Sequence, residues 1–375
     1  MRCDPELWGR LVHEKYDQLG FKLHRPTEWT VVAGILLVNP AEEVQVIAVG
    51  AGVKCLPAKS VSSSPLCYQL VRDSHAEVLA RRALIAYLYN QMVVAETGQG
   101  PSILVGDRED GFSLREGYSL GMYISQAPCG DASMHLLPPF LPQREVEEGG
   151  PNKRVRTLRG RDHTGLRGLR TKPGRADRPP CESMSCTDKI ALWSVVGWQG
   201  AVLSRWLRRP ICINILVVAE GFDCDSLREA IGNKAGVDLK FLEYTGESFR
   251  YGQIAVTQRL DDKEALTPAS VGQAWSLVPS SQTGSRETLC DGRRLGAGKP
   301  RNGRLNPKCQ SILSTESLLR LMGLGGVTED CAKIKKDNRE YQERKAQIFA
   351  VDGRFTGWIQ SNHILEEFRR TLETS

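Results

Sequence analysis

Three segments of the chain each place a possible metal-binding side chain at the start of a predicted helix, and this constrains the fold strongly. His75 opens the helical pattern "SHAEVLARRAL", Cys129 follows a strand-like run, and Cys186 opens the pattern "SMSCTDKIALW". Imidazole and thiolate are good zinc ligands, and a catalytic zinc site has three protein ligands and one open position. If the three side chains share one zinc ion, the three helix starts must meet at one place.

The stretch "PCGDASMH", Pro128 to His135, resembles part of a known metal motif but lacks one ligand. Zinc-dependent nucleobase deaminases combine His-x-Glu with Pro-Cys-x-x-Cys. Here His75, Glu77 and Cys129 match, whereas Ala132 stands where the second cysteine is expected. A lone His-x-Glu is more often part of an ordinary helix. Two interpretations stay open from these residues: there is no zinc site, or a distant residue such as Cys186 completes it.

The apolar pattern predicts strands that alternate with helices, which is typical of a three-layer α/β domain. Asp73 or Ser74 is the expected N-cap of the helix that contains Glu77, and the Gly- and Ser-rich residues 261–304 are expected to form loops. Strands are expected within residues 28–52, 118–128 and 211–221, and helices within residues 1–20, 67–93, 184–207, 314–324 and 328–351.

One segment carries the whole positive excess of the chain. Residues 151–180 contain ten Lys or Arg and two Asp, a net charge of +8, so a chain total of +6 leaves −2 for the remainder. Such a run is either a solvated surface loop or a phosphate-binding surface for nucleic acid. Because the run lies between Cys129 and Cys186, the segment that separates two candidate ligands is also a candidate RNA contact.

The remaining composition favours an intracellular globular protein. A membrane-spanning helix needs roughly 18 or more apolar residues in a row, and no such run occurs. The first residues interleave charged and apolar side chains and lack the core of a signal peptide. Eleven cysteines without framework spacing are typical of a reducing compartment, cytoplasmic or nuclear. No membrane contact and no protein partner are expected.

Four stretches together are similar to the adenosine-to-inosine editing deaminase family. They are "DSHAEVLARRAL", "PCGDASM", "LRTKPGRADRP" and "SMSCTDKIALWSVVGWQGAVLSRWL", and the similarity extends from about Trp29 to Ile359. The "KPGRADRP" stretch, Ser133 where the RNA editors carry arginine, and the lack of a double-stranded-RNA-binding module resemble the tRNA-specific adenosine deaminase 1 group. The resemblance implies a cytidine-deaminase-like α/β/α core with a mixed sheet, extended by C-terminal helices.

The resemblance also implies which residues carry the chemistry. Zn²⁺ would be held by His75, Cys129 and Cys186, so the second cysteine of the motif is displaced along the chain. Glu77 would act as general acid and base while water replaces the amine at C6 of adenine. The implied substrate is the anticodon-loop adenosine 3′ of the anticodon, in an alanine tRNA.

A buried inositol hexakisphosphate is a further expectation from the resemblance. Its candidate ligands are Arg81, Arg82, Lys189, Lys335, Tyr341, Lys345 and Trp358. Asp73 would form, with Lys189, a hydrogen-bonded relay from this polyanion to the metal. Three positions depart from the family pattern, namely Leu192, Cys331 and Gln360. The alternative for the C-terminal lysines is an ordinary solvated helix face.

Candidate RNA contacts are Arg170, Lys172 and Arg175 in the basic run, and Lys54, which resembles a family lysine near the nucleotide pocket. Val53 stands where family members often have threonine. The expected organisation is an N-terminal helical segment, residues 1–28, packed on a deaminase domain, residues 29–375. That domain carries a basic insertion at residues 145–180 and a loop-rich insertion at residues 261–304.

Three alternatives to a tRNA deaminase remain: an editor of other structured RNA, a catalytically silent RNA-binding scaffold, and a purely structural zinc site. The last would normally have four protein ligands and no adjacent glutamate.

Overall fold

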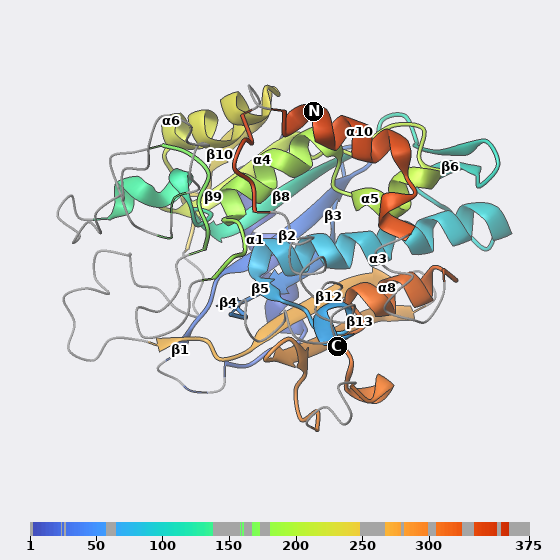
Figure 1. The fold of residues 1–375 in the computed structure, drawn as a ribbon, viewed down its shortest axis with the longest axis horizontal. Coiled ribbons are helices and arrows are strands. Elements are labelled where there is room, and N and C mark those ends of the chain that lie inside the picture. The colour runs from blue at the N-terminus through green and yellow to red at the C-terminus, as the bar shows by residue number, and fades with distance from the viewer. Residues whose placement is uncertain are drawn as a thin grey trace, which may run out of the picture.

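An eight-stranded mixed sheet forms the middle layer of the folded molecule (Figure 1). The computed structural model describes residues 3–23, 25, 28–57, 65–137, 158, 160, 167–172, 181–247, 267–278, 281–298, 305–324, 334–350 and 354–359. In order across the sheet, the strands are β10 (Lys240–Glu243), β9 (Ile215–Glu220), β8 (Ser119–Gln126), β2 (Val32–Val38), β3 (Val44–Ala51), β12 (Gly272–Val278), β13 (Ser281–Cys290) and β14 (Arg293–Arg294). Strands β8, β9 and β10 are parallel, and the other pairs are antiparallel.

Short strand pairs and helices complete the described fold. Three two-stranded pairs are β1 (Glu28–Trp29) with β11 (Thr267–Pro268), β4 (Val53–Cys55) with β5 (Asp73–His75), and β6 (Leu104–Asp107) with β7 (Gly111–Leu114). The α-helices are α1 (Pro5–Gln18), α3 (Ala76–Thr97), α4 (Cys186–Val196), α5 (Gly200–Leu203), α6 (Cys224–Leu227), α8 (Thr315–Leu321) and α10 (Arg339–Ile348). The remaining helical turns are η1 (Pro65–Tyr68), η2 (Asp131–Leu136), η3 (Ser204–Trp206), the π-helix η4 (Arg228–Asn233) and η5 (Pro307–Cys309).

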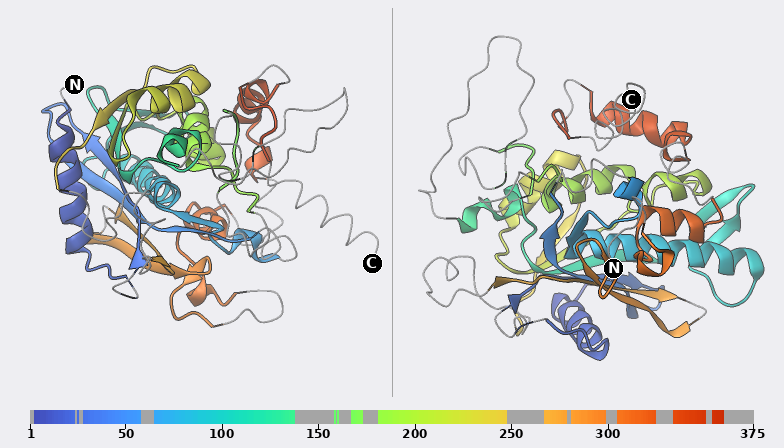
Figure 2. Two further views of the ribbon diagram at one scale, coloured as in Figure 1. Left: turned by 90° about the vertical axis from the view of Figure 1, so that its left-hand side faces the viewer. Right: turned by 60° about the horizontal axis from the view of Figure 1, so that its bottom comes forward.

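The sheet is covered on both faces, as the two-sided burial of β2 requires. All seven residues of β2 are buried. Because successive side chains of a strand point to opposite faces, Ile35 belongs to one apolar cluster and Leu36 to the other. Helix α1 packs on one face, and α3 and α4 pack on the other (Figure 2, left). This confirms the predicted three-layer α/β fold with a mixed sheet.

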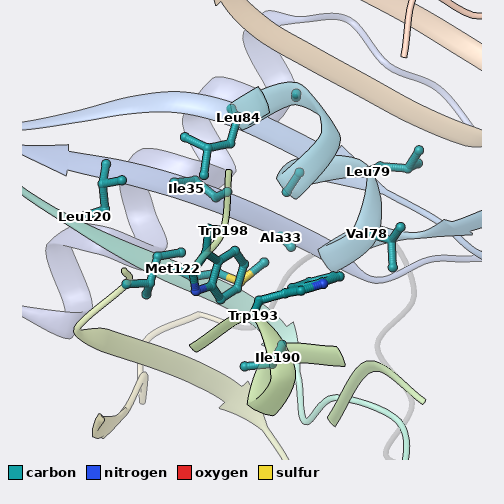
Figure 3. Close-up of a cluster of buried hydrophobic side chains, with 14 of the residues drawn as sticks. Ala33, Ile35, Val78, Leu79, Leu84, Leu120, Met122, Ile190, Trp193 and Trp198 are labelled. Carbon is teal, nitrogen blue, oxygen red and sulfur yellow. The ribbon is translucent and has the colours of Figure 1, made fainter. Parts of the chain in front are cut away.

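Helix α3 lies unusually close to the sheet because Gly50 of β3 has no side chain. A Cβ atom at position 50 would overlap the backbone carbonyl of Ala76 and the backbone amide of Ala80. On the same side of the sheet, Trp193 of α4 packs against Trp198, and their ring centroids are 5.1 Å apart. Figure 3 shows both indoles beside Met122 of β8. Helices α3 and α4 are thereby fixed on one face with their first residues near each other.

The prediction of loops throughout residues 261–304 is wrong, because β12 is an inner strand of the sheet. Its polar residues suggested a surface segment, but they have buried partners. Gln273 accepts a hydrogen bond from the Tyr16 hydroxyl at 2.6 Å, and the Ser276 hydroxyl donates to the Ala83 carbonyl at 2.9 Å. Trp275 is buried against the α1 layer. Because these polar side chains have hydrogen-bond partners inside the protein, polar and apolar residues do not alternate clearly along β12. The sequence pattern therefore did not indicate a strand.

The predicted N-cap of helix α3 is wrong. Asp73 and Ser74 do not cap α3; they lie in β5, and His75 holds the N-cap position. The Asp73 carboxylate instead accepts a hydrogen bond from the His75 amide at 3.1 Å.

The basic insertion, residues 145–180, lies mostly outside the described residues, apart from short pieces up to Lys172. Within the described ranges, no helix combines the length and apolarity needed to cross a membrane.

Gly50→Ala is expected to lower the free energy of unfolding by about 1–3 kcal/mol, because the new methyl group meets backbone atoms that cannot rotate away. The measurement is urea denaturation followed by circular dichroism. Gly298→Ala is the matched control, since a Cβ atom there meets open space. Equal stability of the two variants would contradict the close approach of α3.

Candidate metal centre

The three candidate ligands meet at the starts of α3 and α4. His75 lies at the end of β5 and precedes α3, Cys129 follows β8, and Cys186 is the first residue of α4. The Nδ1 atom of His75 lies 3.8 Å from the Cys129 Sγ atom and 3.6 Å from the Cys186 Sγ atom. A tetrahedral zinc ion with ordinary bond lengths separates nitrogen and sulfur ligands by about 3.6 Å. The three side chains therefore form a cluster of the right size for one metal ion.

Backbone groups at the start of α4 hold the Cys129 loop in place. The Cys186 amide donates to the Cys129 Sγ atom at 3.4 Å, and the Thr187 amide donates to the Cys129 carbonyl at 3.0 Å. Gly130 has a φ of +118°, a conformation that other residues rarely adopt, and a side chain there would overlap Ser185. The position of one candidate ligand is thus tied directly to the helix that carries another.

The two cysteines differ in their electrostatic surroundings. A hydrogen bond from Cys186 lowers the pKa of Cys129 well below that of an ordinary thiol, although burial opposes this, while Lys172 and His75 assist it. Burial raises the pKa of Cys186. The start of a helix also favours thiolate through its oriented amides. One thiolate is therefore stabilised by the protein itself.

Lys172 lies among these groups, which the sequence did not suggest. Its side chain is 1% exposed, and its Nζ atom lies 2.8 Å from the Cys186 Sγ atom and 3.3 Å from an Asp73 oxygen. Burial alone would lower the pKa of Lys172, but Asp73, the two cysteines and Glu77 outweigh it and raise that pKa. Lys172 is therefore an internal cation of the site.

Asp73 connects Lys172 to Lys189. Its carboxylate accepts from the Lys189 ammonium and from the Ser183 hydroxyl at 3.2 Å, and Lys189 also donates to Ser183 at 2.6 Å. Burial would raise the pKa of Asp73, but the two lysines hold it below its ordinary value. The geometry is that of a continuous polar chain, the arrangement that a relay through Asp73 and Lys189 needs.

Glu77 lies in the first turn of α3, two residues after His75, with 3% of its surface exposed. Burial raises its pKa, and nearby Cys129 adds to this effect, whereas Lys172 and His75 oppose it. Glu77 is not part of the three-residue cluster that could hold a metal. A buried carboxyl with a raised pKa holds its proton more readily than an exposed one, which suits a group that accepts and donates protons.

A second buried charge network joins the two cysteine segments. Arg170 is fully buried and pairs with Asp131, just after Cys129, while its backbone amide donates to Asp188 of α4 at 2.8 Å. Lys234 donates to Asp188 at 2.7 Å and lies 3.7 Å from Asp131. The expectation that Arg170 and Lys172 contact RNA therefore needs correction, since both side chains are enclosed by protein.

Two of the candidate polyanion ligands, Arg81 and Arg82, lie on α3. Arg81 stacks over the Trp193 ring at 4.5 Å, and its buried Nε atom has no hydrogen-bond partner among the residues that the structure describes. Arg82 donates to the Leu313 carbonyl and to the Thr315 hydroxyl. Burial lowers the pKa of both guanidinium groups to about 10. Two guanidinium groups are therefore enclosed by protein at this place.

The other candidate ligands lie on several separate segments. Tyr341 and Lys345 are on α10, and burial lowers the pKa of Lys345. Trp358 packs against Phe355, and the Lys335 ammonium lies over the Tyr68 ring at 5.5 Å. Lys189, by contrast, faces Asp73.

Lys54 and Arg175 complete the predicted set. Lys54 lies in β4, is partly exposed, and pairs with Ser74 in the strand register. Arg175 lies outside the described residues, as do Cys331 and Gln360. No sequence signal marks Lys172 as buried within its basic run, because its buried partners come from other segments.

Comparisons with known proteins agree with this site. A family model described as an adenosine-deaminase (editase) domain matches residues 48–362. The chain is 29% identical to the tRNA-specific adenosine deaminase 1 of Drosophila melanogaster over 323 residues, which is 78% of this chain and 75% of that protein. It is 31% identical to the double-stranded RNA-specific editase B2 of Rattus norvegicus over 372 residues, 91% of this chain and 47% of that protein.

A third relative, the tRNA-specific adenosine deaminase 1 of Schizosaccharomyces pombe, is 34% identical over 193 residues, 48% of each chain. The chain therefore spans three quarters of the fly deaminase but only about half of the rat editase and of the fission-yeast deaminase.

Lys172→Met is expected to lower the free energy of unfolding by about 3–5 kcal/mol, because it leaves the thiolate region without its buried cation and Asp73 with Lys189 as its remaining cationic partner. Urea denaturation of the purified protein measures this. Lys308→Met removes an exposed lysine and is expected to change stability by less than about 0.5 kcal/mol. A Lys172→Met protein as stable as the control would show that this cation is not needed.

Proposed function

The chain belongs to the adenosine-deaminase (editase) domain family, and from this premise we propose that it catalyses zinc-dependent hydrolytic deamination of adenosine to inosine in tRNA. The proposed target is the anticodon-loop adenosine 3′ of the anticodon, in an alanine tRNA. We assign the activity to residues 29–375, with residues 1–28 as a helical segment packed on that domain. The proposed location is intracellular, cytoplasmic or nuclear, where tRNA is found.

One observation carries the proposal: His75, Cys129 and Cys186 form a three-ligand cluster with the buried carboxyl of Glu77 beside it. One nitrogen and two sulfur donors suit zinc, and three protein ligands are the number typical of a catalytic site. A structural zinc site would use a fourth protein ligand. The described residues within ligand distance supply three.

The side chains of the site would have different roles in the proposed reaction. When bound, zinc would supply Lewis-acid activation of the attacking water. Glu77 would take a proton from that water and pass protons to the ring nitrogen and the departing amine, because its carboxyl is buried and lies two residues from His75. Lys172 and Asp73 would keep the thiolates and Glu77 in a fixed electrostatic environment.

RNA as substrate is supported by the relatives, two of which are named as tRNA-specific adenosine deaminases. An adenine must leave its stack to reach an enclosed site, and a base in a loop is extruded at lower cost than a paired base. Lys54 and Arg175 remain proposed contacts to the RNA. The match to a double-stranded RNA-specific editase keeps other structured RNA as the second candidate substrate.

We also propose that inositol hexakisphosphate binds between α3, α4 and α10. The fit rests on the enclosed guanidinium groups of Arg81 and Arg82 and on the Arg81 Nε atom without a partner. Buried cations need anionic partners, since uncompensated burial of charge is very costly. Lys189, Lys335, Tyr341, Lys345 and Trp358 are the further proposed ligands, with Asp73 as the link toward the metal cluster. Leu192 offers no such contact.

Glu77→Gln is expected to reduce inosine formation in an alanine tRNA transcript by at least about 10²–10⁴-fold, while the zinc content stays unchanged, because the carboxamide keeps the shape but cannot carry the proton. Glu116→Gln changes an exposed carboxylate in the same way and should keep full activity. Inosine formed only in double-stranded RNA would favour the second candidate substrate. A zinc-loaded wild type that is inactive on both RNAs would instead indicate a silent scaffold.

Acid extraction of the protein purified from eukaryotic cells is expected to release about one inositol hexakisphosphate per chain, measured by mass spectrometry. Arg81→Gln should lower this yield, because the enclosed guanidinium is lost, whereas Arg10→Gln at an exposed position should not. Absence of the compound from the wild-type extract would rule out this part of the proposal.

A further inference from the structure

Two cysteines outside the candidate ligand set lie within reach of each other. The Sγ atoms of Cys55, at the end of β4, and Cys181 are 3.2 Å apart, although the residues are 126 positions apart in the chain. Both are free thiols in the structure. A disulfide joins sulfur atoms at about 2.05 Å, so a contraction of about 1.2 Å would bring this pair to bonding distance.

The surroundings make the two thiols unequal. The Ser183 amide donates to the Cys181 Sγ atom at 3.4 Å. The hydrogen bond with Cys55, together with this amide, lowers the pKa of Cys181 to about 7 against the opposing effect of burial. The same hydrogen bond and burial raise the pKa of Cys55. Cys181 is therefore the nucleophile of the pair and Cys55 the resolving thiol, as in redox-active pairs.

The pair also lies between two segments that lead to candidate metal ligands. Cys55 is directly opposite Asp73 in the β4–β5 register, and β5 ends at His75. Cys181 precedes Ser183, which donates to the Asp73 carboxylate, and the same segment leads into Cys186. A bond between the two sulfurs would therefore connect the strand that leads to one candidate ligand with the segment that leads to another.

We propose that Cys55 and Cys181 form a reversible disulfide that lowers the activity of the metal centre when a peroxide oxidises the protein. The Cys181 thiolate attacks one peroxide oxygen, the O–O bond breaks, and a sulfenic acid and hydroxide result. The hydroxide takes up the proton that the Cys181 thiol released and becomes water. Cys55 then attacks the sulfenic sulfur, which releases a second water and forms the S–S bond. The two thiols lose two electrons and two protons in total, and the peroxide is reduced to two waters. A thiol reductant reverses the step.

The site itself is tested without any activity measurement. The full-length, zinc-loaded protein is treated with an equimolar amount of hydrogen peroxide, alkylated and digested without reduction. A peptide that joins Cys55 to Cys181, lost on treatment with dithiothreitol, is expected, and zinc should stay bound. A disulfide between Cys129 and Cys186 with release of zinc, or overoxidation of Cys181 without the cross-link, would overturn the proposal.

Variants separate this pair from the other thiols. Cys181→Ser should abolish the cross-linked peptide, and Cys55→Ser should leave Cys181 as a sulfenic acid that dimedone traps. Cys212→Ser, at an exposed cysteine, should cross-link like the wild type. Because the wild-type peptide map is decisive on its own, a variant that fails to fold does not remove the test. A cross-link that persists in Cys181→Ser would contradict the assignment.

The effect on turnover rests on the proposed function and is measured separately. Oxidised wild type is expected to form inosine in alanine tRNA several-fold more slowly than reduced protein, with recovery after dithiothreitol, whereas Cys181→Ser should not respond. Cross-linked, zinc-loaded protein that turns over at the full rate would overturn the coupling to the metal centre. Absence of deamination in every redox state would count against the proposed function, while the peptide map still decides the disulfide.

Discussion

The ammonium group of Lys172 holds together a site that would otherwise be a cluster of repelling anions. Two thiol groups and the carboxyls of Asp73 and Glu77 surround it in the protein interior. Lys189 supplies a second cation through Asp73. With a divalent metal on the two thiolates, the positive and negative charges of these groups balance. The protein can therefore enclose four acidic groups without the large penalty of unpaired buried charge.

The same charges position the backbone. Arg170 pairs with Asp131 next to Cys129, and its amide reaches Asp188 in the first turn of α4. Amides of Cys186 and Thr187 then bind the sulfur and the carbonyl of Cys129. The distance between two candidate ligands that are 57 residues apart in the chain is thus set by short-range contacts. Cooperative networks of this kind stabilise one arrangement when every member is satisfied.

Much of this could be predicted from the sequence, and the failures have physical causes. Helical periodicity and strand-like runs placed His75, Cys129 and Cys186 at element boundaries, and the apolar run that contains β2 was predicted as a strand. The sequence did not reveal β12, because the polar groups of Gln273 and Ser276 are satisfied inside the fold. Nor could it identify Arg170 and Lys172 as internal, since a basic run looks solvated until the acidic partners from distant segments are known.

The anchoring of Arg170 and Lys172 bears on how such a domain can diverge in evolution. The ion pair between Asp131 and Arg170 holds the two ends of the intervening segment together, and Asp188 accepts the backbone amide of Arg170. Chain inserted between two clamped ends costs only about 0.6 kcal/mol for each doubling of loop length. Residues between these clamps can therefore be lengthened, shortened or exchanged while the metal-binding geometry is inherited unchanged. Insertion and deletion there leave the residues of the candidate metal cluster unmutated.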